Sequence, residues 1–115
     1  MTSENLIGSS WEVLSIGGEP TLEAGRPDMT FLDDGAVAGK ASINRYRAAV
    51  TLDDDTIEFG MAITTMMAGP KELMDQEQQF LGVLTGRHPW HRDGDELIIG
   101  EGSLALLLRG ATIAP

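Results

Sequence analysis

The chain of 115 residues contains no cysteine. This absence excludes disulfide bonds, thiolate metal sites, a nucleophilic cysteine and the lipidated cysteine that anchors bacterial lipoproteins. Stability must therefore come from core packing, and a domain of this length buries roughly two thirds of the surface that its unfolded chain exposes. We expect a single domain over residues 1–115, with residues 1–8 flexible.

The chain is also poor in basic residues and in long apolar runs. Its Lys and Arg number 8 against 18 Asp and Glu, which gives a net charge of −10. This field would repel a phosphate backbone, so nucleic acid is not an expected partner. The longest apolar run, Leu104 to Leu108, is too short for a bilayer span, and the N-terminus lacks the regions of a signal peptide. We therefore expect a cytoplasmic protein without a membrane span.

Short apolar runs separated by turn signals predict many antiparallel strands rather than alternating strands and helices. Asp-Gly turns near residues 33–35 and 93–95 mark two hairpins, because Asp and Gly tolerate the positive φ of tight turns. Alternation through residues 44–52 places Asn44, Tyr46 and every second residue after them on an inward face. The predicted strands cover residues 11–16, 28–32, 36–40, 44–52, 56–59, 90–92, 96–99 and 103–109.

One helix is predicted over about residues 70–85. Gly69 suits the N-cap, Pro70 suits the first turn, and Gly86 is a plausible stop. Glu77 lies on the same helical face as the apolar stripe, so its carboxylate needs a partner or a route to water. The predicted apolar stripe consists of Leu73, Met74, Phe80, Leu81 and Leu84.

Motif residues occur in a characteristic order along the chain, and we interpret them as structural: Trp11, Gly39, Asn44, Tyr46, Thr65, Met67, Pro70, Glu77 and Phe80. Their order and spacing resemble the META domain (HslJ-like) family, in which an early Trp precedes Gly-x-x-Gly-Cys-Asn-x-Tyr, Thr-Arg-Met-Ala-Cys-Pro and a helix with Met-x-x-Glu-x-x-Phe-Leu. The resemblance implies a small α+β domain in which one helix covers a curved, barrel-like antiparallel sheet. It also implies a loose association with stress response or the cell envelope.

Departures from the family pattern carry information of their own. Both cysteine positions of the pattern are filled by other residues, Ile43 and Gly69, so any pairing between them is lost. That loss is consistent with a reducing compartment. An Arg of the pattern is also replaced, by Met66. If that Arg would have met the helix glutamate, Glu77 needs another partner here, for which Arg45 or Arg47 is a candidate.

Asn44 is expected to be a structural latch. Its inward-facing amide must find hydrogen-bond partners, and the backbone of the irregular segment 64–69 is the natural one. We expect Asn44→Ala to cost on the order of 1 to 3 kcal/mol of stability.

No catalytic, cofactor-binding or metal-binding residue is predicted. His88 and His91 are three residues apart and would share a helical face, but Pro89 argues against a helix there. The acidic run 53–55 lacks the spaced ligands of a calcium loop. A nucleophilic Ser or Thr finds no support, because there is no Gly-x-Ser-x-Gly elbow and no histidine near the Thr pair at 64–65.

Two side chains are possible ligand contacts. Met66, with Met67, could line an adaptable groove, although core filling beside the helix is the favoured interpretation. Trp90 is expected to be partly exposed near a hairpin, where it could stack on a ligand.

Two functions from different classes stay open. The favoured one is a non-enzymatic module that holds a protein or a small apolar ligand. The alternative is a small hydrolase with a polar site assembled around Asn44 and Glu77. A binding module predicts that these polar groups satisfy one another, whereas an enzyme predicts an open cleft and a carboxylate of raised pKa.

Overall fold

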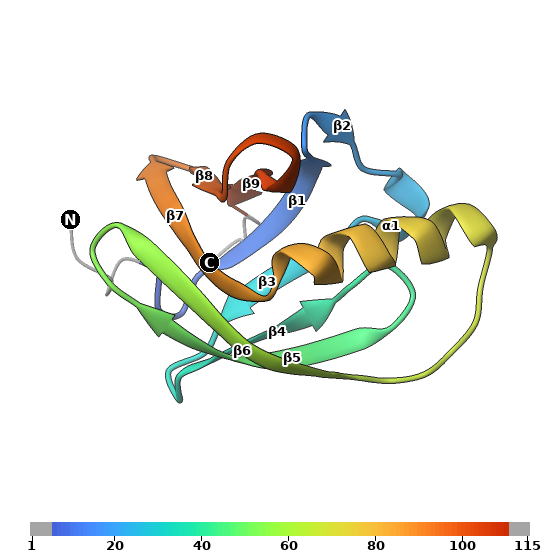
Figure 1. The fold of residues 1–115 in the computed structure, drawn as a ribbon, viewed down its shortest axis with the longest axis horizontal. Helices are drawn as coiled ribbons and strands as arrows, with labels where there is room; N and C mark the ends of the chain where they lie inside the picture. Colours follow the sequence, from blue (N-terminus) through green and yellow to red (C-terminus); the bar gives the residue numbers. More distant parts are fainter. Residues whose placement is uncertain (1–5, 111–115) are drawn as a thin grey trace, which may run out of the picture.

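The structure is a computed structural model that describes residues 6–110. Its strands form one antiparallel sheet in the order β2-β1-β3-β4-β5-β6-β7-β8-β9, and β1 also pairs with β9, which closes the sheet into a barrel (Figure 1). The two-residue β2 lies outside the closed ring, beside β1. The strands are β1 (Ser10–Ile16), β2 (Glu19–Pro20), β3 (Asp28–Phe31), β4 (Ala36–Lys40), β5 (Arg45–Leu52), β6 (Thr56–Thr64), β7 (Gly86–Asp93), β8 (Glu96–Ile99) and β9 (Leu106–Gly110).

The predicted barrel-like sheet with one packed helix is confirmed; the differences are the short strand β2, which was not predicted, and the positions of element ends. β6 continues past the predicted end at Phe59 as far as Thr64, because a bulge opposite Ala49 absorbs Gly60 and lets pairing with β5 resume. β9 starts three residues late, since a 3₁₀ turn (Gly102–Leu104) precedes it. The hairpin turns at Gly35 and Gly94 have the positive φ expected of them.

The interior of the barrel is the hydrophobic core. Along β5, Tyr46 and Ala48 are buried while Arg45 and Arg47 are exposed, so the predicted alternation of faces is confirmed. Leu6 is fully buried in the same core, and the N–H of Gly8 donates to the carbonyl of Phe31. The packed domain therefore includes residues 6–8 of the segment that was expected to be flexible, and residues 1–5 lie outside the described residues.

Helix α1 (Lys71–Val83) lies across the end of the barrel where the β2–β3, β4–β5 and β6–α1 connections gather (Figure 1). Pro70, one residue later than predicted, is the N-cap. The buried face contains Gln76, Glu77, Phe80 and Val83. Met74 is 40% exposed, so its place in the predicted stripe is wrong. At about 100° per residue it lies roughly 120° around the axis from Phe80.

Candidate functional site

A buried carboxylate and a buried amide meet where α1 crosses the barrel end. Glu77 in α1 and Asn44, which directly precedes β5, are each 5% exposed. Oε1 of Glu77 accepts hydrogen bonds from the backbone N–H groups of Ile43 (2.9 Å) and Asn44 (2.7 Å). Oε2 accepts a third from Nδ2 of Asn44 (2.7 Å). The helix is thereby tied to the β4–β5 turn.

The Asn44 amide also holds the segment that leads from β6 into α1. Its Nδ2 donates to the carbonyl of Met67 (3.1 Å), and its Oδ1 accepts from the N–H of Met67 (2.7 Å) and the hydroxyl of Thr65 (2.9 Å). The expected partners of Asn44 in segment 64–69 are confirmed. One amide therefore connects the start of β5, the helix and the segment before the helix.

Glu77 is held by neutral donors. Burial of the carboxyl acts to raise its pKa, but the hydrogen bonds from Asn44 and Ile43 outweigh burial and lower the pKa below its ordinary value. The expected pairing of Glu77 with Arg45 or Arg47 is wrong, because strand alternation directs both arginines to the outer surface, where Arg47 pairs with Asp34. The arrangement favours an ionised, immobile carboxylate.

Next to Glu77, Gln76 makes a second set of buried hydrogen bonds that joins α1 to the rest of the chain. These hydrogen bonds were not predicted from the sequence. Oε1 of Gln76 accepts from the N–H of Leu22 (2.8 Å), and its Nε2 donates to the carbonyl of Gly25 (2.8 Å). The hydroxyl of Ser42 donates to the same carbonyl (2.8 Å), and Ser42 itself has a φ of 145°. A positive φ explains why the family pattern has glycine at this position. The sequence did contain a signal for this role. Gln76 lies four residues before Phe80, so helical spacing places its amide on the buried face, where it needs hydrogen-bond partners.

Gly39 and Tyr46 form a third motif contact, around Asp28. The hydroxyl of Tyr46 donates to the carbonyl of Asp28 (2.8 Å), and Oδ1 of Asp28 accepts from the N–H of Lys40 (2.9 Å). A Cβ on Gly39 would lie 2.4 Å from that carbonyl oxygen. Burial first, and the charge of Asp28 second, raise the pKa of Tyr46 well above its ordinary value. These motif residues therefore act in packing.

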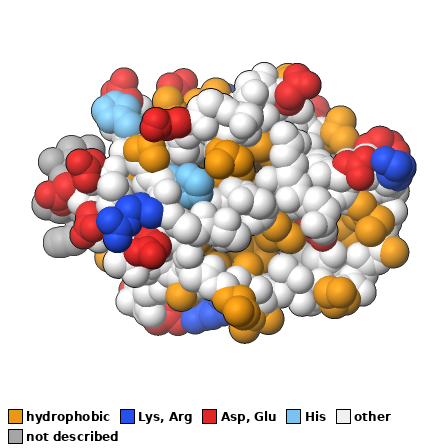
Figure 2. All heavy atoms as spheres, viewed as in Figure 1, with side chains coloured by type: hydrophobic (Ala, Val, Ile, Leu, Met, Phe, Trp, Pro, Cys, Tyr) orange, Lys and Arg blue, Asp and Glu red, His pale blue; other side chains and the backbone are white. Residues whose placement is uncertain are grey.

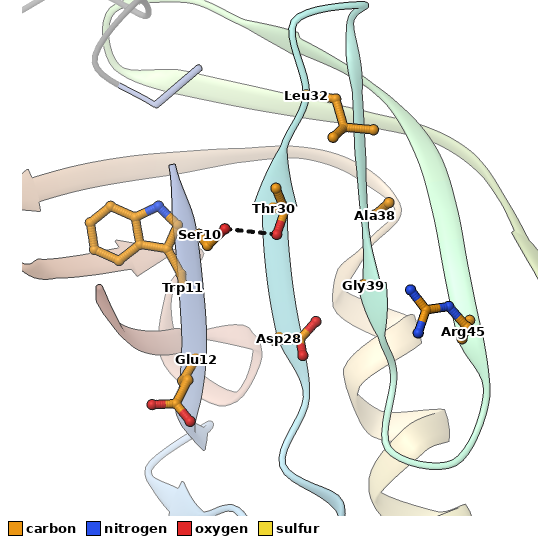
Figure 3. Close-up of a pocket in the computed structure, with 9 residues that line it drawn as sticks. All are labelled: Ser10, Trp11, Glu12, Asp28, Thr30, Leu32, Ala38, Gly39 and Arg45. Carbon is orange, nitrogen blue, oxygen red and sulfur yellow. Dashed lines mark hydrogen bonds between the residues drawn. The ribbon is translucent and has the colours of Figure 1, made fainter. Parts of the chain in front are cut away.

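A hollow of about 570 Å³ lies on the outer surface of strands β1, β3, β4 and β5 (Figure 3). Figure 3 shows Ser10 and Thr30 joined across neighbouring strands, at 2.9 Å, with Asp28 and Glu12 further along them. The charged residues that line this hollow are exposed or half-buried. The hollow therefore lacks the group of buried polar side chains, pointing toward one another, that is typical of a catalytic or ligand-binding site.

A smaller hollow of about 280 Å³, which we call the α1–β6 groove, lies between the helix and the end of β6. Met66 is 92% exposed and Met67 is 55% exposed, so the expectation that they fill the core is wrong. Their segment is held by the backbone of Met67, which leaves the side chains on the surface. Figure 2 shows hydrophobic side chains along the lower edge of the molecule, where Figure 1 places β6 and the segment leading to α1. The groove is lined by Asn44, Thr64, Thr65, Met66, Met67, Ala68, Met74, Glu77, Gln78 and Leu81.

The remaining candidates lie on β7. Trp90 is 7% exposed and its indole N–H donates to the carbonyl of Asp53 (2.9 Å), so the expected partial exposure is wrong. Closure of the barrel against β6 and β8 buries the ring. His88 is buried, with Nε2 2.9 Å from the carbonyl of Thr85, whereas His91 is exposed. Within residues 6–110, no group of three or more His, Asp or Glu is placed to hold a metal ion.

Fold and site together define a small closed antiparallel β-barrel with a helix latched across one end by buried amide and carboxylate side chains. The chain belongs to the META domain family, whose sequence profile matches residues 4–111. No curated protein matches the chain. Within residues 6–110, no helix is long and apolar enough to cross a membrane.

Two solved structures share the fold. One NMR structure has a TM-score of 0.76 and 17% sequence identity, over 95% of this chain and 94% of the other. A second NMR structure, of a protein from Burkholderia xenovorans, has a TM-score of 0.72 and 22% identity, over 96% of this chain and 86% of the other. At such identities the similarity concerns the fold alone.

The lowered pKa of Glu77 predicts a specific pH dependence. Because the folded pKa lies below the ordinary value of 4.5, the stabilisation is fully present above about pH 4.5 and is lost as the pH falls through the folded pKa. We expect Glu77→Gln to lower the free energy of unfolding by about 2 kcal/mol at neutral pH, since the new NH₂ group faces Nδ2 of Asn44. The difference from wild type should shrink in urea titrations near pH 3. An equal difference at both pH values would contradict the assignment, and exposed Glu72→Gln is the matched control.

The two positions that carry cysteine in the family pattern lie side by side. A Cβ on Gly69 would be 3.2 Å from Cγ1 of Ile43, the position that a cysteine sulfur would take. We therefore expect the double variant Ile43→Cys/Gly69→Cys to form a disulfide under mild oxidation. The bond should raise the free energy of unfolding by about 2 to 3 kcal/mol relative to the reduced form. Mass spectrometry and urea titration with and without reductant measure both effects, with Ile43→Cys alone as control. A free thiol pair in the folded, oxidised sample would contradict the predicted proximity.

Proposed function

We propose that this META domain is a non-enzymatic binding module whose contact surface is the α1–β6 groove. The observation that carries the proposal is a contrast within that groove. Its polar groups, Asn44 and Glu77, are hydrogen-bonded to one another and to the backbone, whereas Met66 and Met67 are exposed. Satisfied polar groups rigidify a site, and exposed thioethers adapt to an apolar partner.

The same groups argue against the hydrolase alternative. A general base for work near neutral pH needs a raised pKa and reach to a substrate. Hydrogen bonds from Asn44 and Ile43 lower the pKa of Glu77 and occupy both of its carboxylate oxygens. These features favour a positioning role for the carboxylate over proton transfer.

The setting of this module is proposed from the resemblance and the composition. The family pattern supports a role linked to stress response or the cell envelope. The absence of cysteine, with Ile43 and Gly69 at the positions of the pattern's pair, supports a cytoplasmic site of action. Detection of the native protein in a fractionated cell tests this part of the proposal.

Native mass spectrometry of freshly purified protein tests the binding function. We expect a retained apolar ligand or partner, and we expect Met66→Ser/Met67→Ser to lose it. Leu104→Ser, at an apolar position 46% exposed elsewhere on the surface, should retain it. A wild-type protein without bound mass, and with no gain in the fluorescence of anilinonaphthalene sulfonate over the double variant, would contradict the proposal. An esterase activity lost in folded Glu77→Gln would favour the hydrolase.

A further inference from the structure

One half of β6 has an open backbone edge. On one side β6 pairs with β5 up to Thr64. On the other side β7 pairs with it only from Thr56 to Phe59, where Phe59 lies opposite Gly86. Within residues 6–110, no strand covers that side of β6 beyond Phe59. The open edge runs from residue 60 to residue 64, and its last residue, Thr64, lines the α1–β6 groove.

The hydrogen-bond register shows which backbone groups lie on the open side. The N–H of Thr65 donates to the carbonyl of Arg45 (3.1 Å), on the β5 side. In an antiparallel ladder alternate residues bond to alternate sides, so Ala62 and Thr64 direct their N–H and C=O groups away from β5. No described residue bonds to these groups. An unpaired edge of this kind is a template for a further strand.

Apolar side chains surround the open edge. Met61 is 89% exposed and Ile63 is 73% exposed, both on β6, and the exposed Met66 and Met67 lie in the segment that follows β6. Met74 of α1 lines the opposite wall of the groove. Isolated exposed apolar residues are ordinary, but this set is concentrated beside one strand edge. The arrangement supplies side-chain contacts for a strand that pairs there.

The charge of the groove selects among possible occupants. Glu77 is the charged residue among the lining side chains, and its hydrogen-bond donors are neutral. Neither Lys nor Arg lines the groove. The whole chain carries a net charge of −10, which opposes pairing with a second copy and attracts a cationic partner.

We infer that the open edge of β6 binds an extended peptide segment of a partner protein by strand addition, and that this segment carries apolar and Lys or Arg side chains. The inference rests on the proposed function and adds the class of partner to it. Backbone groups of Ala62 and Thr64 supply the pairing, the exposed Met and Ile side chains supply apolar contact, and Glu77 supplies the favourable field.

The experiment uses ¹⁵N-labelled protein and a capped peptide of alternating valine and lysine, about seven residues long, which is enough to span the edge from residue 60 to residue 64. We expect amide shift changes at residues 60–68 and along the groove side of α1. The same peptide N-methylated at alternate residues, on the edge that would face β6, should bind at least about tenfold more weakly, because it lacks the N–H donors. A glutamate-for-lysine peptide should also bind more weakly.

A protein variant provides a second test. Ala62→Pro removes an N–H on the open side and leaves the β5 ladder intact, so it should fold and bind the peptide about tenfold more weakly. Ile98→Ser, at an exposed apolar position on β8, should bind as wild type does. If Ala62→Pro does not fold, the N-methylated peptide decides the question alone.

The outcomes separate this inference from the proposed function. Equal shifts with the normal and the N-methylated peptide would show contact through side chains only, which overturns strand addition and leaves the binding function. If neither peptide causes shifts but anilinonaphthalene sulfonate shifts the same residues, the groove binds apolar molecules and the peptide inference is wrong. If no probe causes shifts, both fail. A dimer paired through residues 60–64 would make a second copy the occupant and would also overturn the inference.

Discussion

Asn44→Ala is expected to lower the free energy of unfolding by about 3 kcal/mol, the upper end of the range for the loss of buried hydrogen bonds to a charged group. The substitution removes four hydrogen bonds of one side chain. It leaves Oε2 of Glu77, which is 5% exposed, and the backbone N–H of Met67 without those partners. Urea titration at neutral pH measures the loss.

The control is Gln78→Ala, which removes an exposed amide from the same helix and should change stability by less than about 0.5 kcal/mol. An equal effect of the two substitutions would mean that the Asn44 amide is not a latch. Asn44→Asp gives a further readout. Its carboxylate would face that of Glu77, so part of the lost stability should return as the pH falls and the pair takes up a proton.

The second large effect is expected at Gly39. A Cβ there would lie 2.4 Å from the carbonyl oxygen and 2.3 Å from Oδ1 of Asp28. The carboxylate could turn away, but the carbonyl belongs to β3 and accepts the hydroxyl of Tyr46, so β3 and β4 must separate. We expect Gly39→Ala to cost about 3 kcal/mol or more, at the upper range for overpacking.

Gly82→Ala is the matched control for Gly39→Ala and should act in the opposite direction. A Cβ at Gly82 would meet no atom within 4 Å, and the residue lies inside α1. Alanine is the better helix former by about 1 kcal/mol, so this variant should melt at a higher temperature than wild type. Equal destabilisation by the two alanines would refute the close approach of Asp28.

Both effects arise at motif residues, and both are structural. Gly39 permits the approach of β3, and Asn44 holds the segment before the helix. The surface that we propose for binding begins where this structural set ends, at Met66 and the open edge of β6. We therefore expect function in this fold to depend on the exposed side chains around the Asn44 latch. These side chains can vary without loss of the barrel.

Local pattern was sufficient for much of the fold. Alternation along β5 determined that Tyr46 and Ala48 face inward, because successive side chains of a strand point to opposite faces. Pro70 and the apolar spacing after it determined the helix. The inward position of Asn44 also determined that its amide needs partners, and the adjacent irregular segment was the available source.

Other features depended on contacts between distant parts of the chain. The donors to Glu77 are two backbone N–H groups and the Asn44 amide, 33 and 34 residues away, which no local pattern specifies. Trp90 is buried only because β7 closes between β6 and β8, and Met66 is exposed because the latch holds the backbone of the next residue. The sequence by itself determined which faces of each element are apolar and which polar groups need partners. Tertiary structure decided which groups meet, because barrel closure brings residues together that the chain separates.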